Sequence, residues 1–162
     1  MNSGGIMKYL NETPKNINDL LRMANDRTNW KHRLEAVHKM KRYDCDMVRE
    51  KLAYLALHDR VFIVKKEAYK VAHELDVVVD GKPIFLGKKD IGYKLRDFKE
   101  LFAVIKKRVH MDKLDVEKVK KEMKLLNPEM YDVMNYEKGK KINNWIKDVY
   151  GSLHNEKLKM DN

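Results

Sequence analysis

The sequence predicts an all-α protein in which a short antiparallel helical stack is followed by a small C-terminal helical module. Three observations support this prediction. Only ten of the 162 residues are glycine or proline, so long stretches are free of helix-breaking residues. Apolar residues recur at helical spacing over most of the chain. Hydrophobic residues make up 43% of the chain and charged residues 37%, which suits a core beneath a highly charged surface.

The first half begins with residues 1–15, a polar segment that we expect to be a flexible tail. Four amphipathic helices are expected within residues 16–76, and short connections make successive helices antiparallel. Either Asp44 or Asp46 is expected to cap the third helix. The residues that we expect to face inward are Ile17, Leu20, Leu21 and Ala24; Trp30, Leu34, Val37 and Met40; Val48, Leu52, Leu55 and Ala56; and Val61, Val64, Ala68, Val71, Ala72 and Leu75.

These helices contain an internal repeat. The order basic, any residue, Glu, Ala occurs in "HRLEAVHKM" and again 32 residues later in "VKKEAYKVA". A period in the thirties that contains two helices is typical of α-solenoids. The stretch 59–75 resembles the HEAT-repeat family, with Val64, Lys65, Ala68, Ala72 and Leu75 at the family positions.

The resemblance covers about residues 17–76. It implies a stack of helical repeats in which the basic residue after a valine pairs with a loop aspartate, here Asp59 or Asp44. An ordinary antiparallel helical bundle is the alternative interpretation.

Residues 77–92 interrupt the helical pattern. They contain three of the seven glycines and one of the three prolines, and valines and aliphatic residues flank Asp80-Gly81. We expect either a small hairpin or an irregular excursion, and Pro83 restricts any strand pairing to an edge. The domain boundary is placed in this segment.

A separate helical module is expected over residues 93–154. Its three apolar stripes are Phe98, Leu101, Phe102, Ile105 and Val109; Leu114, Val116, Val119, Met123 and Leu126; and Ile142, Trp145, Ile146, Val149 and Leu153. The second stripe begins near Asp115. Asn127 is expected to cap a short helix with Pro128 at its first position, and Gly139 to close a loop before the last helix. Residues 155–162 are expected to form a second flexible tail.

Positive charge is concentrated in the middle of the chain. The net charge is +10, and residues 81–112 carry nine basic against four acidic side chains. The candidate anion-binding or nucleic-acid-binding residues are Lys88, Lys89, Lys94, Arg96, Lys99, Lys106, Lys107, Arg108, Lys120, Lys121 and Lys124. Such residues can neutralise phosphates, but a solvated lysine-rich surface is the alternative. The scarcity of arginine argues against reading of base edges.

The sequence contains no pattern that indicates catalysis. His32, Glu35 and His38 form H-x-x-E-x-x-H, and steps of three residues set the two histidines about 120° apart on a helix, unlike the H-E-x-x-H of zinc proteases. No nucleophile elbow or glycine-rich phosphate loop occurs. We therefore expect no catalytic residues, metal, cofactor or small-molecule substrate.

The remaining features concern location and function. Cys45 is the only cysteine, so no intrachain disulfide is expected and the composition fits the cytoplasm. No apolar run approaches the length of a membrane span. The sequence favours non-enzymatic recognition of another protein by a small HEAT-like adaptor or regulator, and the positive charge would suit an acidic partner. The alternative is a regulator that binds DNA or RNA through residues 88–124.

Overall fold

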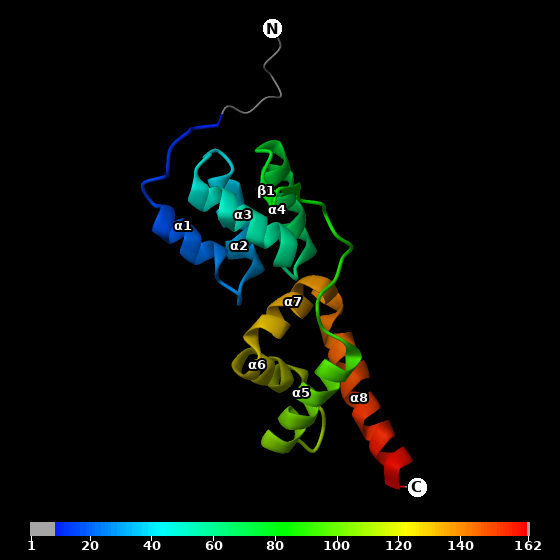
Figure 1. Cartoon of the computed structure of the whole chain (residues 1–162). Coiled ribbons are helices and arrows are strands. Elements are labelled where there is room, and N and C mark those ends of the chain that lie inside the picture. The colour runs from blue at the N-terminus through cyan, green and yellow to red at the C-terminus, as the bar shows by residue number, and fades with distance from the viewer. Residues whose placement is uncertain (1–8, 162) are drawn as a thin grey trace. The chain divides into compact units, whose positions relative to one another are not determined.

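The computed structural model describes residues 9–161, with side chains described for residues 9–153. Within this range the protein is mainly α-helical, as the sequence predicts (Figure 1). Contacts divide the chain into two compact units, Met1–Ile91 and Gly92–Asn162. The division lies near the end of the segment 77–92, so most of that segment belongs to the first unit.

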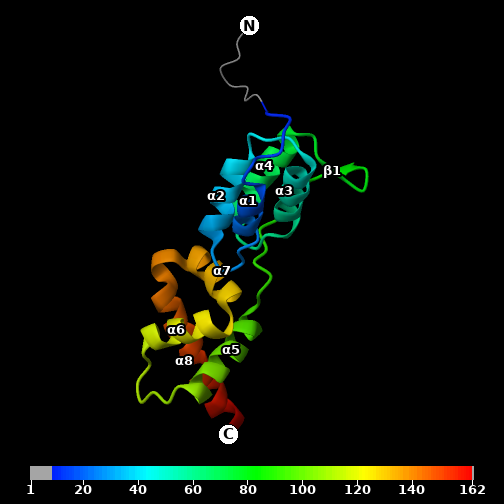
Figure 2. The same cartoon turned by 90° about the vertical axis from the view of Figure 1, so that its left-hand side faces the viewer.

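Two helical pairs build the first unit (Figures 1 and 2). The helices are α1 (Ile17–Ala24), α2 (Trp30–Met40), α3 (Asp46–His58) and α4 (Phe62–Glu74). α1 packs against α2, α3 packs against α4, and the pairs meet where α2 contacts α4. Cys45, and neither Asp44 nor Asp46, is the N-cap residue of α3, because the Asp44 carboxylate accepts hydrogen bonds from Arg49 instead.

The buried face of α2 differs from the one expected. The buried residues are Arg33, Ala36, Val37 and Met40, whereas Trp30 and Leu34 are only partly buried. The cause is an ion pair inside the stack. The Arg33 guanidinium donates to both oxygens of Asp59, from Nε at 2.8 Å and from Nη2 at 3.2 Å, so Arg33 occupies a place that an apolar residue was expected to fill.

The loop aspartates therefore have different partners. Arg49, which follows Val48, binds Asp44 of the preceding loop, with Nε 2.5 Å from Oδ1. Asp59 binds Arg33 of the other helical pair. The HEAT-repeat resemblance instead implies that Asp59 could pair with the basic residue after Val64. The Arg33–Asp59 ion pair connects the α3–α4 turn to α2.

The segment before α1 departs from the expected tail where it is described. Leu10 forms a parallel bridge with Tyr43; its N–H donates to the Arg42 carbonyl at 2.8 Å, and its carbonyl accepts from the Asp44 N–H at 2.9 Å. Pro14 is buried. The two backbone hydrogen bonds of Leu10 fasten this part of the segment to the α2–α3 turn. The rest of the expected tail, residues 1–8, lies outside the described residues.

A small hairpin follows α4, which is one of the two structures expected for residues 77–92. Strands β1 (Val78–Val79) and β2 (Lys82–Pro83) are antiparallel, with Val78 opposite Pro83 and Val79 opposite Lys82. Asp80 and Gly81 have φ angles of 53° and 74°. Positive φ at both central residues is the mark of a type I′ turn, whose twist matches that of paired strands.

The second unit consists of helices. They are α5 (Leu95–Arg108), α6 (Val116–Leu126), α7 (Pro128–Lys138), the 3₁₀ turn η1 (Gly139–Lys141) and α8 (Ile142–Asp161). The Asp115 side chain accepts from the N–H groups of Glu117 and Lys118 at the start of α6. Asn127 caps α7 through the Met130 N–H at 3.1 Å, with Pro128 at the first turn. The cap of α7 agrees with the sequence prediction, and α6 begins next to Asp115, where the second apolar stripe was expected to begin.

Residues of the three expected apolar stripes and of α7 form the core of the second unit, and α5, α6 and α7 all contact α8. Its fully buried large side chains are Phe102, Ile105, Val119, Met123, Val133 and Ile146. Leu126, expected inside, is 37% exposed, because α6 ends there. α8 extends through residues 155–161, where the sequence predicts a flexible tail. That stretch contains no glycine or proline and several strong helix formers.

Replacement of Ala68 by leucine is expected to destabilise the first unit by about 1–3 kcal/mol. Ala36 and Ala68 occupy equivalent positions in the 32-residue repeat, and both are completely buried on the helices that join the two pairs. A larger side chain would force α2 and α4 apart. The measurement is the urea midpoint by circular dichroism, with the exposed Lys66→Leu as the control. An unchanged midpoint for Ala68→Leu would contradict close packing at this position.

Candidate functional site

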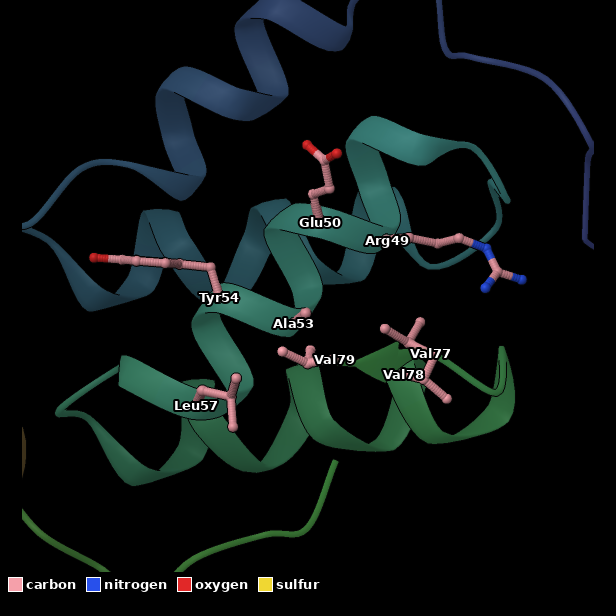
Figure 3. A pocket seen from close by; sticks show the side chains of 8 residues that line it. All are labelled: Arg49, Glu50, Ala53, Tyr54, Leu57, Val77, Val78 and Val79. Carbon is pink, nitrogen blue, oxygen red and sulfur yellow. The ribbon is translucent and has the colours of Figure 1, made fainter. Parts of the chain in front are cut away.

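An open apolar pocket lies between α3 and the hairpin. Its volume is about 420 Å³, and its lining residues are Arg49, Glu50, Ala53, Tyr54, Leu57, Val77, Val78 and Val79. Figure 3 shows Ala53 and Val79 facing each other across the pocket, with Leu57 beside them and the Arg49 and Tyr54 side chains extending outward. Apolar groups therefore form its floor and polar groups its rim. We call it the α3–hairpin pocket.

The end of α4 positions the hairpin. Asp76 has a φ of 54°, the Asp76 N–H donates to the His73 carbonyl at 3.1 Å, and the Val77 N–H donates to the Ala72 carbonyl at 2.9 Å. These two bonds form a Schellman motif, in which an aspartate takes the left-handed position that glycine usually fills. The chain reverses at this point, and Val77 and Ile84 are buried at 8% and 6% exposure. They anchor a hairpin whose tip extends from the helices beside α3 (Figure 2).

Several apolar side chains at and beside the pocket are exposed to solvent. Val78 is 56% exposed, Tyr54 46%, and Leu57 and Val79 37% each. On α3, Met47 is 48% exposed and lies two helical turns before Tyr54, on the same face. Single exposed apolar residues are normal on a protein surface, but several that adjoin each other indicate an interaction site.

Arg49 at the rim and the nearby Lys51 of α3 both have intramolecular partners. The hydrogen bond from Arg49 keeps the pKa of Asp44 below its usual range, against the opposing effect of burial. Lys51 donates to the Asn25 side-chain oxygen at 2.6 Å and lies 4.9 Å from the centre of the Tyr54 ring. Burial lowers the pKa of Lys51, and the charge of Arg27 adds to the decrease. This arrangement orients the rim and offers no acid–base pair aimed into the pocket.

The predicted basic residues are divided between the two units. Lys88 and Lys89 belong to the first unit, and the other nine belong to the second. Each unit carries the same excess charge: 18 basic and 13 acidic residues in 1–91, and 17 and 12 in 92–162, or +5 for each. The excess of charge is therefore not confined to the middle of the chain.

On α5 the basic residues point to different sides. Lys106 and Arg108 are two positions apart, which sets them about 160° apart around the helix. Lys106 Nζ lies 5.8 Å from the Tyr150 ring centre on α8, whereas Arg108 Nε lies 3.0 Å from Glu122 Oε2 on α6. The structure does not bring these two cations onto one face.

Two basic residues of α6 also have partners within the unit. Lys120 Nζ is 3.5 Å from Glu117 Oε1, and Lys124 Nζ lies 4.8 Å from the Tyr131 ring centre. Lys121 is exposed on the same helix. At the start of α5, the Lys94 backbone N–H donates to Asp97, and its side chain is exposed, as are those of Arg96 and Lys107.

No group of three or more histidine, cysteine or carboxylate side chains suited to hold a metal occurs among the described residues. Two members of H-x-x-E-x-x-H, His32 and Glu35, have other partners. His32 Nδ1 is 2.9 Å from Asp26 Oδ2, and Glu35 forms an ion pair with Lys39 at 3.0 Å. The pKa of Asp26 is lowered, since hydrogen bonds from Thr28 and His32 together outweigh the effect of its burial.

Sequence reasoning missed the α3–hairpin pocket. The available signal was the set of apolar residues on α3 that fall outside its inward stripe, namely Met47, Tyr54 and Leu57, followed by three consecutive valines after α4. Because successive side chains of a strand point to opposite faces, only some of those valines are expected to be buried. The sequence does not show which helix the others approach.

Comparisons with known proteins found no relative. No protein-family model matches the chain, no curated protein matches it, and no solved structure matches it. Within the described residues, no helix combines the length and apolar character needed to cross a membrane.

Proposed function

We propose that the protein is a non-enzymatic recognition protein, an adaptor or regulator whose α3–hairpin pocket binds an apolar segment of another protein. We further propose that α1–α4 belong to the HEAT-like class of helical repeats and that the protein works in the cytoplasm, which its single cysteine would suit. The observation that carries the function is the adjoining set of exposed apolar side chains around the pocket.

The geometry favours a protein over a small molecule as the ligand. Small-molecule sites enclose most of the ligand and aim a few polar groups at it, whereas this pocket is open and the Arg49 guanidinium at its rim pairs with Asp44. An apolar floor with a polar rim is the arrangement found at protein interfaces. Covering half-exposed side chains such as Tyr54, Leu57 and Val78 would contribute about 1 kcal/mol each.

The proposal predicts that Val78→Asp or Leu57→Asp removes a specific partner. Each change places a charge where an apolar contact is expected, and capture from an extract of the native cell should fall about tenfold. The matched control is Leu125→Asp, which changes a 65% exposed leucine of the second unit. Quantitative mass spectrometry compares the proteins retained by the variants, and circular dichroism verifies that they are folded.

The proposal requires that at least one protein is captured by wild type and by Leu125→Asp but not by Val78→Asp or Leu57→Asp. Identical sets of captured proteins for all four chains would exclude the pocket as a binding site. Nuclease treatment of the extract should leave the capture unchanged, because the contact is apolar and direct.

Binding of DNA or RNA is the second candidate function. The observation in its favour is the group of exposed cations on α5 and α6, among them Arg96, Lys107 and Lys121. The ion pairs of Arg108 and Lys120 weaken it, because those side chains are already neutralised. A partner lost on nuclease treatment, together with binding that falls steeply as salt rises, would favour this function over the first.

A further inference from the structure

The second unit has an apolar groove along one side of α5. Its volume is about 530 Å³, and its lining residues are Leu95, Arg96, Lys99, Glu100, Ala103 and Leu153. We call it the α5–α8 groove, because Leu153 comes from α8 and the other five residues from α5. Leu95 is 55% exposed and Leu153 is partly buried, so the apolar floor is open to solvent.

Three cations follow the same side of α5. Arg96, Lys99 and Lys106 are separated by three and then seven residues, which places them within about 80° around the helix and over about three turns. Ala103, the small residue between them, leaves space above the helix backbone. Lys106 continues the line beyond the groove toward Tyr150 of α8. We call these three residues the basic edge.

The charge of the groove is unbalanced. Among its described lining residues, Arg96 and Lys99 carry positive charge and Glu100 carries negative charge, and Lys106 adds a third cation beyond the groove. A ligand that enters the groove therefore gains by carrying negative charge on one side and apolar groups on the other.

We propose that the α5–α8 groove binds an acidic amphipathic helix of another protein. Two adjacent helices with a small residue between larger ones form a groove that accepts a third helix, and such ligands use apolar anchors at i, i+3, i+4 and i+7. Leucine-like anchors would contact Leu95, Ala103 and Leu153, and carboxylates along one edge would pair with Arg96, Lys99 and Lys106. This surface is separate from the α3–hairpin pocket and does not rest on the function proposed for it.

A nucleic acid fits the groove less well than an acidic helix. A phosphate backbone would satisfy the cations, but it has no apolar groups for the exposed Leu95 and for Leu153. A longer phosphate-binding surface would need neighbouring cations. Lys120 of α6 is already paired with Glu117, and Arg108 of α5 faces Glu122 on the other side of the helix. Charge and apolar surface together favour the peptide.

A charge-swap experiment on the full chain tests the proposal. The probe is a fluorescent synthetic peptide of about five helical turns, with leucine on one face and glutamate on its flanks; a matched peptide carries lysine in place of every glutamate. Fluorescence anisotropy measures binding to wild type, to the triple variant Arg96→Glu, Lys99→Glu, Lys106→Glu, and to Leu95→Asp. The control Lys118→Glu, Lys140→Glu, Lys141→Glu makes the same change in net charge outside the groove.

Wild type and the control should bind the glutamate peptide and prefer it to the lysine peptide. The basic-edge variant should lose about tenfold or more in affinity for the glutamate peptide and gain affinity for the lysine peptide. Leu95→Asp should weaken binding of the glutamate peptide; its new carboxylate lies in the first turn of α5, where negative charge favours the helix, so the variant should fold.

Three results would overturn the proposal. One is equal binding of the two peptides by wild type. Another is an equal loss in the control variant, which would assign the effect to net charge alone. The third is displacement of the glutamate peptide by a short DNA duplex that binds through the basic edge, which would assign the groove to nucleic acid.

Discussion

Replacement of Asp59 by alanine is expected to lower the free energy of unfolding of the first unit by about 3–5 kcal/mol. The side chains of Arg33 and Asp59 are 7% and 3% exposed. Without this carboxylate, the buried Arg33 guanidinium would lose its ion pair with Asp59. The Val61 N–H would also lose its acceptor, since it donates to Asp59 Oδ1 at 2.9 Å.

Arg33 also contacts a neutral group. Its Nη1 donates to the Asp26 carbonyl at 2.8 Å, which is a neutral acceptor. Removal of one member of a buried ion pair destabilises a protein more than replacement of both members by apolar residues of similar volume. The double replacement leaves no charge buried. Asp59→Ala combined with Arg33→Met should therefore be more stable than the sum of the single effects predicts.

Urea unfolding at neutral pH measures these effects. The protein has two tryptophans, Trp30 in the first unit and Trp145 in the second, so Trp30 fluorescence in a Trp145→Phe background reports on the first unit. The control is Arg22→Ala. Its ion pair with Asp19 at 2.7 Å has side chains 77% and 69% exposed, and exposed pairs contribute little. Similar small losses for Asp59→Ala and Arg22→Ala would contradict a structural role for the buried pair.

Replacement of Trp145 by alanine is expected to destabilise the second unit by about 3 kcal/mol, at the lower end of the range for buried aromatic residues. The indole ring meets Phe98 at 5.0 Å between centroids with an interplanar angle of 89°, and Phe102 at 5.7 Å and 63°. Phe102 is completely buried. The expected loss is at the lower end because the tryptophan itself is only partly buried.

The conservative variant separates packing from other roles. Trp145→Phe keeps an aromatic ring against Phe98 and Phe102, so it should lose only about 1 kcal/mol. Thermal unfolding followed by circular dichroism measures both variants. If Trp145→Ala stays as stable as wild type but loses a binding partner, the residue is an anchor of an interface and not of the core.

Local features of this protein could be predicted from its sequence. The caps of α6 and α7, by Asp115 and Asn127, depend on side chains within three residues of the groups that they bind. The type I′ turn depends on the two residues Asp80 and Gly81. The apolar stripes depend on a period of 3.6 residues. Each of these rests on neighbours along the chain, so the sequence contains both partners.

The candidate sites could be predicted only in part. Arg96 and Lys99 were among the eleven cations selected, but nothing in the sequence distinguished them from Arg108, which faces Glu122. The difference arises from rotation around α5 and from the helix that packs on each side. Leu153, expected in the core stripe, lines the α5–α8 groove instead, because Leu95 and Ala103 leave the groove open there.

The sequence by itself determined the helical class and the start of α7 at Asn127, because hydrogen bonds and caps within a helix join residues that are close along the chain. The tertiary structure decided which polar residues are buried and which apolar residues are exposed. Arg33 is buried because Asp59, 26 residues away, lies against it. Val78 remains exposed because the reversal at Asp76 sends the hairpin beside α3, where only part of its apolar surface is covered. Burial depends on what the rest of the chain places nearby, and that information is not local.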